Sequence, residues 1–179
     1  MKEIQEKIIS DIGRKAEELY LSKQLLCSES VLVALNSGLG QPIEKEMAIN
    51  LMAAFPGGIG NSGCLCGALT GGLTALGIVL GKRFSRKEVR AAAQDLHNQF
   101  TQKYKVTCCR VLIKGVKGDP KAHFEQCSKI TGHTAELAAR LLFELKPSLL
   151  EKADQKYLAK KEKLVIVKRL LAFINKIRG

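Results

Sequence analysis

The sequence predicts an all-α protein that folds as a single-domain helical bundle, and three observations support this prediction. The chain has 179 residues, which is enough for one domain with a buried core. Apolar residues recur at helical spacing in several segments, and most of these segments begin with residues that favour a helix start. No alternation of apolar and polar residues is long enough to indicate a strand.

The first predicted helix covers residues 2–26. It is amphipathic, because charged residues separate apolar ones at helical spacing, namely Ile4, Ile8, Ile12, Leu19 and Leu26. Cys27 follows this segment and stands directly before "SESVLVAL", in which Ser28 and Glu29 favour a helix start. We therefore expect Cys27 at or near the N-terminus of a second helix.

Residues 47–81 contain no charged side chain. The stretch "FPGGIG" interrupts them, since Pro56 and the glycines after it do not continue a helix. Residues 66–80 then predict a helix rich in small residues. Its continuous apolar part has about 16 residues, whereas a bilayer-spanning helix needs about 20. We therefore predict a buried central helix in which glycines allow close packing, and not a membrane span.

Two further helices are predicted from their starts. Ser85 and Glu88 have the spacing of a capping box and open a helix that extends to about Lys103. Thr107 is predicted to cap a short helical turn that contains Cys108 and Cys109.

The last long helix begins at Asp119 and Pro120, an N-cap followed by proline at the first helical position, and extends to Pro147. One face of it carries Cys127, Ile130, Thr134, Leu137 and Leu141.

The C-terminal residues 151–179 carry nine Lys and Arg against three acidic residues, about half of the net charge of +12. They predict a basic amphipathic helix, with two adjacent apolar stripes formed by Leu164, Val167, Leu171 and Ile174 and by Ile166, Leu170, Phe173 and Ile177. We expect this helix to cover the core or a dimer interface, and binding to an anionic membrane surface or a partner is the alternative. Nucleic acid is not an expected partner, because no aromatic residues alternate with the basic ones.

The chain has six cysteines, at positions 27, 64, 66, 108, 109 and 127. Its N-terminus lacks the apolar segment of a secretory signal, so we expect a cytoplasmic protein. In a reducing compartment, clustered thiols are more often metal ligands or redox groups than structural disulfides, although a buried cysteine also serves as a small apolar residue. Cys27, Cys66, Cys108 and Cys109 fall at predicted helix N-termini, where the helix dipole favours a thiolate.

Several familiar thiol motifs are missing from the sequence. There is no Cys-x-x-Cys, no Cys-x-x-Cys-His for covalent haem and no ferredoxin spacing, so haem is not expected. Cys64 and Cys66 can still bind one metal centre together. The side chains of Cys108 and Cys109 are adjacent and normally diverge, so we expect only one of the two to point inward.

The order of Cys27 in "CSESVLVAL", "GGIGNSGCLCGALTGGLTALG", Cys109 and Cys127 resembles the redox-active proteins of the C-GCAxxG-C-C family. The resemblance extends from Cys27 to about Leu145. It implies redox chemistry, with Cys27, Cys66, Cys109 and Cys127 as the family cysteines and Gly67, Ala68 and Gly71 as packing residues. This chain has Cys66-Gly67-Ala68 where the family name has Gly-Cys-Ala, and Cys64 and Cys108 are additional. A similar domain in multihaem cytochromes suggests iron–sulfur binding.

The leading hypothesis is therefore a thiolate-metal protein, with an iron–sulfur cluster, that transfers electrons. Its expected ligands are Cys66, Cys109 and Cys127, followed by Cys27 and Cys64. One alternative is a metal-free thiol–disulfide oxidoreductase with Cys64 and Cys66 as attacking and resolving thiols. Another is an adaptor without enzymatic activity, in which the cysteines fill the core and the basic C-terminal helix binds a partner or a membrane surface. We expect a redox partner protein and a homodimer.

Overall fold

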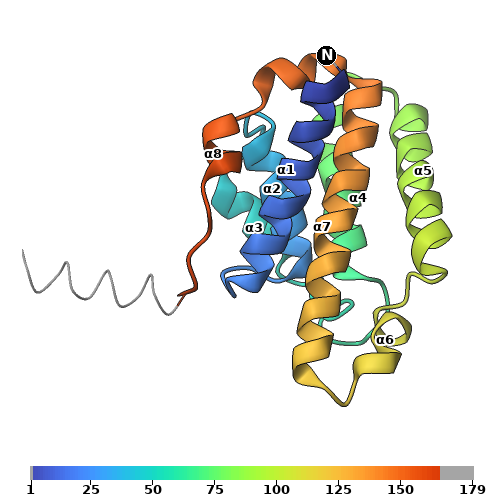
Figure 1. Cartoon of the computed structure of the whole chain (residues 1–179). Helices are drawn as coiled ribbons and strands as arrows, with labels where there is room; N and C mark the ends of the chain where they lie inside the picture. Colours follow the sequence, from blue (N-terminus) through green and yellow to red (C-terminus); the bar gives the residue numbers. More distant parts are fainter. Residues whose placement is uncertain (1, 166–179) are drawn as a thin grey trace, which may run out of the picture.

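The computed structural model describes residues 2–165 of the chain, and within these residues it is helical apart from connecting loops and one isolated β-bridge. Four helices form the central bundle: α1 (Lys2–Leu21), α2 (Cys27–Gly38), α4 (Gly67–Leu80) and α7 (Pro120–Leu145). Helix α7 packs along α1, and α4 lies against both α2 and α7 (Figure 1). The predicted all-α, single-domain bundle is confirmed.

Shorter elements surround this bundle. Helices α3 (Lys45–Met52) and α8 (Gln155–Ala159) pack against α2, and α5 (Arg86–Tyr104) packs against α4 and α7 on the opposite side (Figure 1). The short helix α6 (Cys109–Leu112) and the 3₁₀ turn η1 (Lys114–Val116) lead into α7, and the 3₁₀ helix η2 (Pro147–Lys152) follows it. The loop that holds residues 53–66 and helix α6 lie together at one end of the bundle (Figure 1).

Helix α4 is the predicted buried central helix. Gly71 lets α2 approach it closely, because a Cβ atom at this position would lie 2.5 Å from the carbonyl oxygen of Ser28. Among the helices that the structure describes, none combines the length and the apolar character needed to cross a membrane.

The predicted helix starts at residues 85 and 119 are confirmed. The Ser85 hydroxyl accepts the Glu88 N–H at 3.3 Å, and the Glu88 carboxylate accepts the Ser85 N–H at 2.8 Å. The Asp119 carboxylate accepts the N–H groups of Lys121 and Ala122, and α7 ends two residues before Pro147.

Two predicted boundaries were wrong. Helix α1 ends at Leu21, because the Ser22 hydroxyl donates to the Leu19 carbonyl and Lys23 adopts a positive φ of 57°, which turns the chain back. Cys27 then begins α2 as predicted. Farther along, Cys108 and not Thr107 is the N-cap of α6, because Thr107 is still engaged in the extended pairing described below.

The predicted C-terminal helix is not one continuous helix over the residues that the structure describes. Residues 151–164 comprise the end of η2, helix α8 and a non-helical segment that begins at residue 160. Most of the predicted apolar stripes fall on residues 166–179, which lie outside the described residues.

Candidate thiol site

Four of the six cysteines line one small cavity of about 20 Å³. Cys27 comes from the first turn of α2, Cys66 from the residue before α4, Cys109 from the first turn of α6 and Cys127 from α7. The rest of the wall is almost entirely apolar and consists of Gly67, Ala68, Leu112, Ile113, Ile130 and Thr131. All six cysteines are free thiols.

A short antiparallel pairing places Cys66 next to Cys109. The Cys66 N–H donates to the Thr107 carbonyl and the Cys109 N–H donates to the Cys64 carbonyl, each at 2.8 Å, on either side of a β-bridge between Leu65 and Cys108. Two thiols that are about forty residues apart in the sequence thus reach the same cavity.

Glycine in the preceding loop makes this approach possible. Residues 57–61 all have positive φ angles, a conformation that glycine adopts without strain. A Cβ atom on Gly58 would lie 2.8 Å from both the Cys109 Cβ and the Cys64 backbone nitrogen. The loop therefore has no room for a side chain where it supports Cys109.

Gly67 has the same role for Cys27. A Cβ atom on Gly67 would lie 2.6 Å from the Cys27 Sγ. The glycine after Cys66 thus leaves the space that the Cys27 thiol occupies, which gives a physical reason for the Cys-Gly-Ala order in this chain.

Cys64 and Cys108 lie outside the cavity lining. The side chain of Cys64 is exposed, and the half-buried Cys108 thiol donates to the carbonyl oxygen of Gly63 at 3.0 Å. As predicted, only one cysteine of the adjacent pair points inward, and it is Cys109. The structure does not bring Cys64 to the cavity with the four others.

Burial in apolar surroundings controls the charge of the four cavity thiols. It raises the pKa of Cys66 to about 12 and that of Cys127 to about 12, and it also raises the pKa of Cys27 and Cys109. Neighbouring thiols add to this rise in pKa. The backbone amides of Leu69 and Ala68 oppose it at Cys66, but burial is the larger effect. The thiols are therefore protonated at neutral pH.

Sequence reasoning missed Tyr20. This side chain stacks on Phe124 with 4.8 Å between ring centroids, and its hydroxyl interacts with the Cys127 thiol. Burial beside the cysteines raises the pKa of Tyr20. The helical pattern of α1 identifies Tyr20 only as part of an amphipathic helix, so it contains no signal for this contact.

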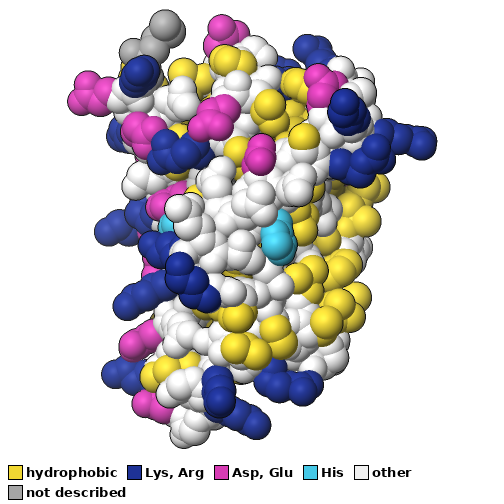
Figure 2. Space-filling view, turned by 90° about the vertical axis from the view of Figure 1, so that its right-hand side faces the viewer, with side chains coloured by type: hydrophobic (Ala, Val, Ile, Leu, Met, Phe, Trp, Pro, Cys, Tyr) yellow, Lys and Arg dark blue, Asp and Glu magenta, His cyan; other side chains and the backbone are white. Residues whose placement is uncertain are grey.

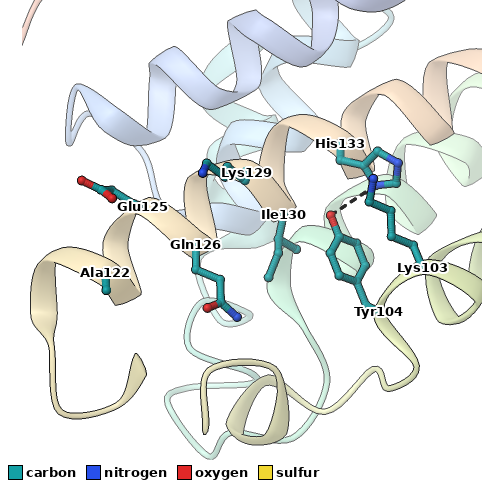
Figure 3. Close-up of a pocket in the computed structure, with 8 residues that line it drawn as sticks. All are labelled: Lys103, Tyr104, Ala122, Glu125, Gln126, Lys129, Ile130 and His133. Atoms are coloured by element: carbon teal, nitrogen blue, oxygen red, sulfur yellow. Dashed lines mark hydrogen bonds between the residues drawn. The ribbon is translucent and has the colours of Figure 1, made fainter. Parts of the chain in front are cut away.

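A wider groove adjoins the cavity, and Ile130 lines both. It lies between the end of α5 and the first half of α7, and its lining includes Lys103 and Lys129 (Figure 3). The Tyr104 hydroxyl lies 3.2 Å from the Nδ1 of His133. Burial and the charge of Lys103 lower the pKa of His133, while burial raises the pKa of Tyr104 to about 12. The sequence analysis did not identify this groove.

The four cavity thiols are suitable donors for a soft metal ion, but their side chains are not positioned around one. Four thiols are the donors that iron–sulfur clusters and zinc take from proteins. Among residues 2–165, however, no group of three or more Cys, His, Asp or Glu side chains is arranged so that it could hold a metal ion. A metal centre here would require the thiols to rearrange.

The fold and the site define an all-α protein with four cysteines around a buried cavity. A family model described as "Putative redox-active protein (C_GCAxxG_C_C)" matches residues 25–141, and the chain belongs to this family. The matched residues contain all four cavity cysteines, whereas α1 with Tyr20 lies outside them. Comparison with curated proteins and with solved structures found no match.

Proposed function

We propose that this redox-active protein transfers electrons through a thiolate-metal centre, an iron–sulfur cluster, held by Cys27, Cys66, Cys109 and Cys127. One observation carries the proposal: four free cysteines from four separate segments line a single apolar cavity. Cysteines that serve only as small core residues would not be expected to gather around one cavity from four separate segments.

The environment of the thiols is consistent with this role. A bound metal would take the place of the protons that the cavity cysteines hold, since a coordinating thiol is deprotonated outright. A cluster would supply a one-electron carrier whose potential depends on burial and on amides near the sulfur atoms. The chain supplies both, because the walls are apolar and the amides of Gly57 and Ser28 favour the thiolate form of Cys27.

A metal-free dithiol centre is the second candidate. The observation that favours it is the absence, among the residues described, of side chains already arranged around a metal position. In this case two of the cavity thiols would donate two electrons and release two protons as they form a disulfide, and an external reductant would return both.

Metal analysis of protein purified without oxygen separates the two candidates. We expect iron and acid-labile sulfide, together with a visible absorption spectrum, in the unmodified chain. Serine substitution of Cys27, Cys66, Cys109 or Cys127 should each remove most of the iron. Cys64→Ser and Cys108→Ser are matched controls outside the cavity and should leave the iron content unchanged.

Two outcomes would contradict the metal proposal. One is a protein without iron or sulfide, both as purified and after anaerobic reconstitution with iron and sulfide. The other is equal iron loss in the cavity variants and in the two controls, which would indicate nonspecific binding. A disulfide between two cavity cysteines in the iron-free protein would then support the second candidate.

The expected partner is an acidic redox protein that docks over the groove. Lys103 and Lys129 line the groove together with one acidic residue, Glu125, and the whole chain carries a net charge of +12. On the α5 side, Lys and Arg side chains project around the periphery, Asp and Glu side chains lie among them in the upper part and along the left edge, and hydrophobic side chains run along the right-hand edge (Figure 2). Complementary charge would speed the encounter with such a partner.

A further inference from the structure

The two cysteines that do not line the cavity lie close to each other. The Cys108 thiol donates to the Gly63 carbonyl at 3.0 Å, and this carbonyl belongs to the peptide bond that joins Gly63 to Cys64. The sulfur of Cys108 therefore lies against the backbone of Cys64, whose own side chain is exposed.

The backbone pairing sets a separation that a disulfide can span. Leu65 and Cys108 are directly opposite each other in an antiparallel bridge. In a pair without mutual hydrogen bonds the Cα atoms are about 4.5 Å apart, and the strand rises by about 3.4 Å per residue. With these ideal values, the Cα atoms of Cys108 and of Cys64, the next residue along, come to about 5.6 Å apart. Disulfides join Cα atoms that are about 4.4–6.8 Å apart.

The backbone around the two cysteines is not a regular ladder. In a regular ladder the side chains of Cys64 and Cys108 would point to opposite faces. Here Gly63 has a positive φ of 73° and Cys108 is the N-cap of α6, and the Cys108 thiol donates to the carbonyl of the Gly63–Cys64 peptide. The side chain of Cys64 is exposed, whereas Cys66 and Cys109 are part of the cavity wall.

We infer that Cys64 and Cys108 form a second dithiol–disulfide couple at the rim of the cavity, which reacts with low-molecular-weight disulfides. The Cys64 thiolate attacks one sulfur of the external disulfide, so that a mixed disulfide forms and one thiolate leaves. The Cys108 thiol loses its proton and, as a thiolate, attacks the Cys64 sulfur of the mixed disulfide. The bond between Cys64 and the external sulfur breaks, and the second external thiolate leaves and takes up a proton. The protein loses two electrons and two protons, and the external disulfide takes up both to become two thiols.

This couple is distinct from the proposed cavity centre but lies on the same two segments. Oxidation would link the loop before α4 to α6, the segments that hold Cys66 and Cys109 in place. The redox state of the solution could thus restrain the cavity without consuming any of its four thiols.

Disulfide mapping after exposure to oxidised glutathione tests this inference. The full chain is incubated with oxidised glutathione, its remaining thiols are blocked, and it is cleaved with trypsin. Cleavage separates the cysteines into peptides 24–45, 46–82, 106–110 and 122–129. We expect a linked pair of peptides 46–82 and 106–110, which reverts on reduction.

Single variants identify the cysteines within each peptide, because 46–82 contains Cys64 and Cys66 and 106–110 contains Cys108 and Cys109. Cys64→Ser and Cys108→Ser should each abolish the linked pair, whereas Cys66→Ser and Cys109→Ser should retain it. Unchanged circular dichroism of the first two variants shows that they fold. Cys64 is exposed, so its substitution leaves the core intact.

Three results would overturn the inference. The link could depend on Cys109 and not on Cys108, it could depend on Cys66 and not on Cys64, or Cys64 could remain a mixed disulfide with glutathione. Iron and sulfide are measured on the same samples. Because the mapping needs no metal, a missing rim disulfide and a missing metal centre are separate results.

Discussion

At the scale of single residues, the apolar cavity determines the state of its thiols more strongly than the helix starts do. Sequence reasoning placed Cys66 at a helix N-terminus and concluded that a thiolate is favoured. The amides of α4 do act in that direction, but burial outweighs them and the pKa of Cys66 rises to about 12. A charged sulfur in this cavity therefore needs a metal ion beside it, whereas a thiol or a disulfide is neutral and needs none.

This raised pKa predicts how stability depends on pH in the reduced, metal-free protein. The ordinary pKa of a cysteine thiol is 9.0, so the unfolded chain loses the Cys66 proton near pH 9 while the folded chain keeps it to about pH 12. The contribution of Cys66 to the free energy of unfolding is full below pH 9 and falls as the pH rises through this window. Cys127 acts in the same direction.

Urea unfolding at a series of pH values checks this prediction. Between pH 9 and 11, the free energy of unfolding of the Cys66→Ser variant should fall less steeply than that of the unmodified chain. This holds whatever the absolute stability of the variant. Cys64→Ser, at an exposed position, should keep the original slope. Parallel slopes for all three proteins would show that the Cys66 thiol does not titrate differently on folding.

Gly67 provides a steric prediction with an internal control. In Gly67→Ala the new methyl group would lie 2.6 Å from the Cys27 Sγ, so we expect a loss of about 1–3 kcal/mol and a displaced Cys27. Gly77→Ala in the same helix meets nothing within 4 Å and should raise stability by about 0.5–1 kcal/mol. Denaturant unfolding measures both changes, and equal effects would show that close contact with Cys27 is not the reason for Gly67.

At the scale of elements, helix α5 depends on its capping box. It packs against α4 and α7, and its last residue, Tyr104, reaches the groove beside the cavity. The start of this helix is exposed, so Ser85 and Glu88 satisfy its first N–H groups locally.

Ser85→Ala should therefore lower the free energy of unfolding by about 1 kcal/mol and leave the cavity thiols unaffected. Chemical denaturation measures the loss, and iron content or thiol titration monitors the cavity. Ser10→Ala, on the exposed surface of α1, is the control and should change stability by less than about 0.5 kcal/mol. An equal loss in both variants would contradict the capping role.

At the scale of the whole molecule, a buried lysine holds the segment after α8 against α1. Lys15 is fully buried, and its Nζ donates to the Lys160 carbonyl at 2.5 Å and to the Glu162 carboxylate at 2.7 Å. It also lies 4.6 Å from the centre of the Tyr157 ring. A buried charge is tolerated here because it is paired.

Glu162→Leu should lower stability by about 3 kcal/mol, because it leaves the Lys15 charge buried without its carboxylate. The double variant Lys15→Met/Glu162→Leu removes both charges and should recover most of this loss. Unfolding curves of the single and double variants form a double-mutant cycle. Additive losses would show that the ion pair does not couple the two residues.

The charge of the molecule predicts how it would meet the redox partner that we propose. Lys103→Glu/Lys129→Glu should slow electron transfer to an acidic redox protein, and salt should slow the unmodified protein toward the rate of the variant. Stopped-flow kinetics with an acidic ferredoxin-like acceptor measures both effects. The same double charge reversal at exposed Lys45 and Lys87, away from the groove, is the control.

The homodimer stays a prediction.

The sequence by itself determined the long helices of the bundle, the buried character of residues 66–80 and the positions of Cys27 and Cys66 at helix starts. These features depend on caps, glycines and apolar spacing within a few residues, so local chemistry is sufficient to predict them. One wrong boundary falls where a distant contact intervenes, at Thr107, which an extended pairing with Cys66 keeps out of the helix. The other, at Leu21, has a local cause in the turn at Ser22 and Lys23.

Only the tertiary structure decided which cysteines meet. The family resemblance favours Cys66 over Cys64, but only the structure shows that Cys64 is exposed and that Cys66 lines the cavity with Cys109. Their difference arises from the pairing of residues 63–66 with residues 107–110 and from the packing of α2 and α7 around them. No local pattern encodes the relative position of segments so far apart, because the free energy that places them comes from contacts between them.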